Sequence, residues 1–161
     1  MPRSVSPSRR HAREVLTSWQ VDPSVADTLV LVVSELVTNA VQHAAPPTAP
    51  HRTVTQRFFE LALYALADHV RVEVRDKDRS LPVHAAASDY AEGGRGMEIV
   101  QCCTCRWGAY RVCTGGKVVW CDVGLDGSPC RSERPVPAAR PGTPPHEDGD
   151  PTVSTWPGLS V

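Results

Sequence analysis

One long apolar segment constrains the fold of this chain more than any other feature. Asp22 and Pro23 have the residue types of a helix N-cap and a first helical position, and Pro46–Pro47 stop the segment that follows. Between them, apolar residues fill one broad arc of a helix predicted from Pro23 to about Ala44. An arc of this width predicts that the helix packs on a second layer of secondary structure.

The other predicted elements are short and mostly joined as hairpins. Periodicity predicts a helix from about Ser8 to Trp19, strands over Phe58–Leu66 and Val70–Val74, a helix from Met97 to about Cys103, and strands over Cys105–Val112 and Val118–Val123. Hairpins outnumber crossovers in this order. The predicted fold class is therefore a two-layer α/β sandwich of the α+β type, with a mixed, mostly antiparallel sheet and helices on one face.

Composition divides the chain into a folded domain over residues 1–124 and a tail over residues 125–161. The tail holds eight of the 15 prolines and has no helical or strand period, so it is predicted to be disordered. A formal net charge of −1 argues against nucleic acid or an anionic membrane as a partner. We find no secretory signal and no window of ~20 uninterrupted apolar residues, which predicts a cytoplasmic protein whose six cysteines are thiols.

Two polar residues of the long predicted helix have a spacing that could support chemistry. Glu35 and Asn39 lie four residues apart, where the polar side of the helix meets the apolar arc. An amide oxygen can ligate magnesium, and a carboxylate can accept a proton or orient an attacking hydroxyl. Taken alone, the spacing favours the plainer interpretation that water hydrates both side chains.

Two further features are compatible with a nucleotide. Gly93, Gly94 and Gly96 surround Arg95 just before a predicted helix, where backbone N–H groups, the helix dipole and a guanidinium favour a phosphate. Asp76 lies at the end of the strand VRVEV, and its carboxylate could accept hydrogen bonds from an exocyclic amine such as that of adenine. In isolation the glycines are typical of a flexible loop, and Asp76 of a turn.

The motifs together resemble a known superfamily. In order, the chain shows SELVTNAVQHA at 34–44, VRVEVRDKDRSLP at 70–82, EGGRGMEIV at 92–100, and WG followed by GKVVW at 107–120. This combination resembles the GHKL ATPases, the superfamily of histidine kinases, gyrase and Hsp90. It looks most similar to the small anti-sigma-factor serine kinases of actinobacteria. The resemblance covers about residues 8–124 and implies a Bergerat-type fold.

The resemblance also implies roles for individual residues. Glu35 corresponds to the general base, Asn39 to the asparagine that binds magnesium and links it to the triphosphate of ATP, and Asp76 to the aspartate that recognises the adenine amino group. The implied ATP lid contains the second glycine box, with Gly94, Arg95, Gly96 and Met97. ATP and magnesium are therefore the expected cofactors.

The implied activity is transfer of the γ-phosphoryl group of ATP to a serine or threonine of a partner protein, with or without sequestration of a sigma factor. The implied partners are a sigma factor or an antagonist of an anti-sigma factor, and members of the family often form homodimers.

Two positions depart from the family pattern. Asp78 stands where serine or glycine is common, and Val118 stands where a threonine often helps to bind adenine. They favour an alternative, a binding switch that uses nucleotide occupancy or only the fold to control a partner. The C-x-x-C spacing of Cys102 and Cys105 leaves a zinc-dependent scaffold as a third hypothesis.

Overall fold

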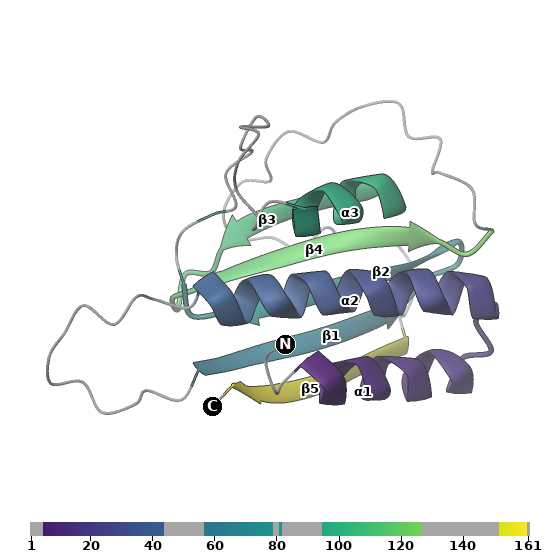
Figure 1. Cartoon of the computed structure of the whole chain (residues 1–161), viewed down its shortest axis with the longest axis horizontal. Helices are drawn as coiled ribbons and strands as arrows, with labels where there is room; N and C mark the ends of the chain where they lie inside the picture. The colour runs from purple at the N-terminus through teal and green to yellow at the C-terminus, as the bar shows by residue number, and fades with distance from the viewer. Residues whose placement is uncertain (1–4, 44–56, 79–80, 82–94, 127–151, 161) are drawn as a thin grey trace, which may run out of the picture.

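The computed structural model describes residues 5–43, 57–78, 81, 95–126 and 152–160. Within these residues, three helices cover one face of a five-stranded sheet (Figure 1). The helices are α1, Val5–Ser18; α2, Pro23–His43; and α3, Arg95–Cys103. The strands are β1, Arg57–Ala65; β2, His69–Asp76; β3, Arg106–Arg111; β4, Lys117–Gly124; and β5, Thr152–Ser160. The predicted two-layer α+β class is confirmed.

The sheet has the strand order β3-β4-β2-β1-β5, and all neighbouring strands in the described part of the chain are antiparallel. The expectation of a mixed sheet is therefore wrong for these strands. The hairpin between β3 and β4 turns at Gly115 and Gly116, whose φ angles of +106° and +84° favour glycine. This turn brings Lys117, the first residue of β4, opposite Asp76, the last residue of β2.

Helix α2 lies over the middle of the sheet. Its N-cap is Asp22, whose side chain accepts a hydrogen bond from the Ser24 N–H at 2.9 Å, as predicted. The apolar arc of α2 packs on strand residues that alternate with outward-facing ones. Fully buried members of this core are Leu29, Val32, Val33, Val37, Leu61, Leu63, Val70, Val72 and Val74.

The same helix meets the length and composition criteria of a membrane span. The stretch Pro23–Gln42 has a mean hydropathy of 1.5, and 61% of its most apolar window is buried inside the protein. Packing in the core of the sandwich therefore explains why most of the side chains of α2 are apolar.

Strand β5 corrects part of the predicted tail. It pairs with β1 along its whole length, from Thr152 opposite Ala65 to Ser160 opposite Arg57. Because β5 lies at the edge of the sheet, Pro157 can occupy it although proline has no N–H to donate. The prediction of disorder is wrong for Thr152–Ser160, and residues 127–151 lie outside the described part of the chain.

Candidate functional site

Glu35, Asn39 and Gly96 meet where α3 begins against α2. A Cβ added at Gly96 would lie 2.6 Å from Glu35 Oε2 and 3.7 Å from Asn39 Oδ1. The absence of a side chain at Gly96 therefore leaves room for the Glu35 carboxylate where α3 starts against the polar edge of α2. Glu35 and Asn39 are both half-buried at this contact, so they share a face of the helix as their spacing predicts.

The N-terminal end of α3 is part of the same arrangement, because Gly96 is the second residue of that helix. The first N–H groups of a helix have no partner within it, and the helix dipole adds a positive potential there. A carboxylate, an amide oxygen and these N–H groups are together suited to a magnesium-bound phosphate and an attacking hydroxyl.

The other residues of the predicted lid differ in what the structure describes. Met97 is half-buried and packs against the hydrophobic core, so its side chain contributes to packing rather than to ligand binding. Its backbone belongs to the first turn of α3. Arg95 is placed as the first residue of α3. Gly93 and Gly94 lie outside the described residues.

Asp76 ends β2 on the side of the sheet that faces the helices. It alternates in step with Val70, Val72 and Val74, which are core residues, and it is only 4% exposed. Figure 1 shows the end of β2, the last turns of α2 and the start of α3 at the same end of the sandwich, on the left. The structure therefore brings the three predicted site segments to one end of the fold.

Lys117 is a site residue that the sequence analysis missed. Its Nζ lies 3.2 Å from Asp76 Oδ1 and 3.1 Å from Asp78 Oδ2, and the Asp78 N–H donates to Asp76 Oδ1 at 2.8 Å. Burial raises the pKa of Asp76, and the Lys117 ammonium and the Asp78 N–H oppose that shift. Asp78 is therefore paired with a cation rather than left as an uncompensated charge beside the site.

The departure at Val118 falls on the opposite face of the sheet. Val119, Cys121 and Val123 belong to the helix-facing core, so the alternating residues of β4 face away from it. Val118 lies opposite Arg75, whereas Lys117 lies opposite Asp76. The strand residue that approaches Asp76 is thus Lys117, and the expectation that position 118 faces the base is wrong. The pairing of β2 with β4 identifies Lys117, because β4 is buried at every position and alternation alone does not show which face meets the helices.

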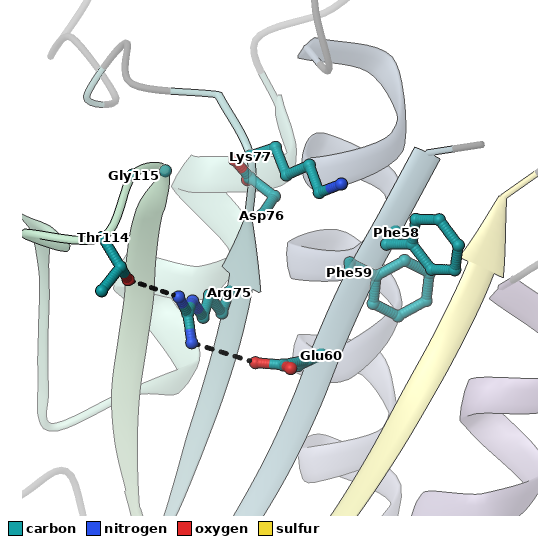
Figure 2. Close-up of a pocket in the computed structure, with 9 residues that line it drawn as sticks. Phe58, Phe59, Glu60, Arg75, Asp76, Lys77, Thr114 and Gly115 are labelled. Carbon is teal, nitrogen blue, oxygen red and sulfur yellow. Dashed lines mark hydrogen bonds and ion pairs between the residues drawn. The ribbon is translucent and has the colours of Figure 1, made fainter. Parts of the chain in front are cut away.

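A hollow of about 420 Å³ lies beside the end of β2, and Asp76 is one of the residues that line it (Figure 2). Glu60 and Arg75 line it from outward-facing positions of their strands, and Arg75 donates to Glu60 at 3.5 Å and to Thr114 at 3.0 Å. These charged and polar groups pair with one another. We therefore assign no triphosphate site to this hollow.

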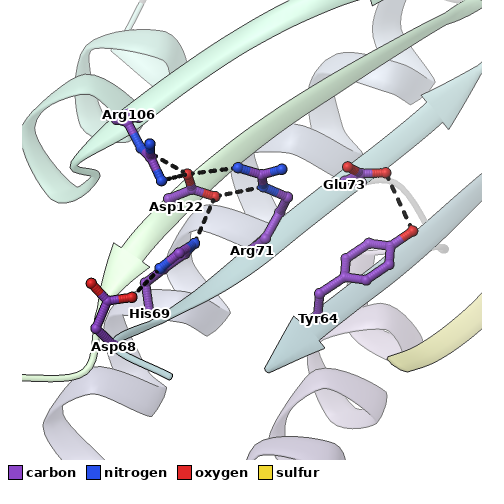
Figure 3. A network of polar contacts seen from close by, with 7 residues as sticks. All are labelled: Tyr64, Asp68, His69, Arg71, Glu73, Arg106 and Asp122. Carbon is purple, nitrogen blue, oxygen red and sulfur yellow. Dashed lines mark hydrogen bonds and ion pairs between the residues drawn. The ribbon is translucent and has the colours of Figure 1, made fainter. Parts of the chain in front are cut away.

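The outward face of the sheet carries a buried polar cluster (Figure 3). Asp122, which is 1% exposed, accepts hydrogen bonds from Arg71 Nε at 2.7 Å, Arg71 Nη2 at 3.0 Å and Arg106 Nε at 3.1 Å. His69 lies beside it, with Nδ1 2.6 Å from Asp68 Oδ1. Since Asp122 faces away from the helices, this cluster stabilises the sheet and is not part of the candidate site.

The cysteines give no support to a zinc site in the described residues. Cys105 is disulfide-bonded, whereas Cys102, Cys103, Cys113 and Cys121 are free thiols. The described part of the chain contains no group of three or more histidine, cysteine or acidic residues that could hold a metal ion. The expectation that every cysteine is a thiol is therefore wrong for Cys105.

These features define a class of protein. It is an α+β sandwich whose central helix presents an acid and an amide to the first turn of a helix with glycine at its second position, and a buried acid lies at the end of a strand. A family model described as the histidine kinase-like ATPase domain matches residues 1–121, and the chain belongs to this family and so to the GHKL superfamily. No curated protein and no solved structure matches it. Membership of this family supports an ATP-binding regulatory function.

Proposed function

We propose that the protein binds ATP and magnesium between α2, α3 and the end of β2, and transfers the γ-phosphoryl group to a serine or threonine of a partner protein. The observation that carries this proposal is the approach of Gly96 to Glu35 and Asn39. That approach combines a carboxylate, a potential metal ligand and the N-terminal N–H groups of a helix.

Each residue has a distinct part in the proposed reaction. Asn39 would ligate magnesium through its amide oxygen, and the metal would neutralise charge on the triphosphate. Glu35 orients or deprotonates the incoming hydroxyl, which then attacks the γ-phosphorus as the bond to the β-phosphate oxygen breaks. The N–H groups at the start of α3 stabilise the negative charge of the phosphates.

Asp76 is proposed to bind the base. Its carboxylate is buried at the end of β2 and can accept a hydrogen bond from the amino group of adenine. Such a bond to an ionised acceptor is stronger than one between neutral groups, so it distinguishes adenine from bases that carry a carbonyl at that position.

The proposed partners are a sigma factor or an antagonist of an anti-sigma factor, in a cytoplasmic switch that also allows a homodimer. The support is the resemblance of the four motifs to small anti-sigma-factor serine kinases. A formal net charge of −1 is consistent with a protein partner rather than nucleic acid.

A second candidate is a binding switch without phosphoryl transfer. The observation that favours it is the Lys117 ammonium, which pairs with both Asp76 and Asp78. In this version nucleotide occupancy changes the affinity for the partner and Glu35 carries out no chemistry.

Calorimetry with ATP, with and without magnesium, followed by transfer of labelled γ-phosphate to a candidate partner, tests both functions. Magnesium-dependent binding with transfer supports the kinase. Binding without transfer to any partner supports the switch. Failure of the full chain to bind ATP overturns both.

A further inference from the structure

We propose that Lys117 is the positioning residue that determines how Asp76 meets the purine base. It holds one carboxylate oxygen of Asp76 and leaves the other free to accept the exocyclic amine of adenine. This inference deepens the proposed function and rests on the proposed ATP site.

The two oxygens of Asp76 differ in their contacts. Oδ1 takes both the Lys117 ammonium, at 3.2 Å, and the Asp78 N–H, at 2.8 Å. Oδ2 makes no hydrogen bond or ion pair with the described residues. Among those residues, His69 Nε2 is the sole fully buried side-chain polar atom without a partner. Asp76 Oδ2 also lacks a partner in this part of the chain but is not fully buried, so it is open to a ligand.

The backbone holds Lys117 in this place. Lys117 is directly opposite Asp76 in the β2–β4 register, at the start of β4, and it is only 5% exposed. Directly before it comes Gly116, which packs against the Asp76 backbone carbonyl so closely that no side chain fits. Lys117 therefore reaches Asp76 from the neighbouring strand and does not depend on a mobile surface contact.

Charge explains why Asp76 needs this partner. The Asp76 and Asp78 carboxylates both approach the Lys117 ammonium, which separates two like charges in a poorly hydrated place. Without the ammonium, the two carboxylates would repel each other, and Asp76 would turn away or take up a proton. Either change removes the ionised acceptor from the base.

The competing explanation is that Lys117 only stabilises the end of the sheet. A purely structural role predicts that replacing Lys117 weakens all nucleoside triphosphates alike. A positioning role predicts that replacement changes the preference between bases. Inosine triphosphate separates the two, because it carries a carbonyl where ATP has the amine and is otherwise nearly the same molecule.

The experiment measures dissociation constants of ATP and inosine triphosphate, with magnesium, for the full chain and for Lys117→Met, Lys117→Arg and Lys77→Met. We expect the unsubstituted chain to prefer ATP by about 10-fold to 100-fold, the range for a hydrogen bond to a charged acceptor. Lys117→Met loses most of that preference, and Lys117→Arg restores part of it. Lys77→Met is the matched control, because it deletes the same charge from a side chain whose Nζ lies over the Phe58 ring, 5.2 Å from its centroid.

Circular dichroism verifies that each variant is folded, and Lys117→Gln replaces Lys117→Met with the same expectation if the latter unfolds. A preference that survives both substitutions, or an equal loss of affinity for the two nucleotides, overturns the inference and leaves the ATP site standing. If the unsubstituted chain binds neither nucleotide, the proposed function falls and the inference falls with it.

Discussion

Glu35 and Gly96 face each other across the contact between α2 and α3, so closely that a methyl group on residue 96 would lie 2.6 Å from Glu35 Oε2. The atom in the way is the far end of a flexible side chain. A substitution at position 96 would therefore displace the carboxylate and leave the backbone of the two helices in place.

This relationship predicts the behaviour of Gly96→Ala. We expect a folded protein that retains ATP binding but transfers the γ-phosphate about 10²-fold more slowly, because a displacement of about 1 Å in a catalytic group has an effect of this size. Transfer rates and dissociation constants measured on the same preparations test it. In the double variant Gly96→Ala, Glu35→Gln, the alanine should add little, since both changes act through one carboxylate. Fully additive losses would contradict this explanation.

Glu35→Gln tests the base itself. The amide keeps the shape of the side chain but cannot accept the proton of the incoming hydroxyl, so phosphoryl transfer should fall by about 10²- to 10⁴-fold. The dissociation constant for ATP should change little. Glu14→Gln, an exposed substitution on α1, is the control and should behave as the original chain does. Parallel loss of binding and transfer in Glu35→Gln would count against its assignment as the base.

Asp76 predicts a pH dependence of base binding. Burial raises the pKa of Asp76 above the ordinary value for an aspartate although Lys117 opposes the shift, so the ionised acceptor is lost at a higher pH than for an exposed aspartate. We expect the affinity for ATP to decline as the pH falls through that range. Asp76→Asn should bind ATP weakly and lack this component, which separates it from the titration of the nucleotide itself.

The same shift has a consequence for folding. A carboxyl whose pKa is raised in the folded state binds its proton more readily there than in the unfolded chain, so its contribution to stability is present at low pH and is lost as the pH rises. The ionised Asp76 thus disfavours folding at neutral pH. The stability of Asp76→Asn relative to the original chain, measured by thermal unfolding, should therefore be greater at neutral pH than at acidic pH.

Asp122→Asn tests the outward polar cluster. The substitution removes the negative charge and one of the two acceptor oxygens that Arg71 and Arg106 share at a site that is 1% exposed, which should lower the free energy of unfolding by about 3–5 kcal/mol. Denaturant unfolding measures this, with Glu60→Gln as the control. The Glu60–Arg75 pair is largely exposed and its loss should cost about 0–1 kcal/mol. ATP affinity of the folded fraction should be unchanged in both variants.

The parts of the fold that local patterns encode were predictable. The helical period and the Asp22 cap located α2, and the spacing of four residues was enough to put Glu35 and Asn39 on one face. The glycines before α3 marked a close approach, although they did not reveal that its partner is Glu35. Strand β5 was missed because the proline count was averaged over the whole tail, and an edge strand tolerates Pro157.

Lys117 shows why the rest of the site was not predictable in the same way. Both faces of β4 carry apolar residues, so alternation alone left open which set faces the helices. The pairing of β2 with β4 resolves this, since it joins residues 41 positions apart in the chain and brings Asp76 opposite Lys117. The resemblance directed attention to Val118, one residue away and on the wrong face.

By itself, the sequence determined the class of fold, the central helix and the chemistry available along it, because helix periods, caps and turns depend on neighbours in the chain. The tertiary structure decided which of these groups meet. Strand register and helix packing bring distant residues within a few ångströms of one another, and a shift of one residue in a strand exchanges its two faces.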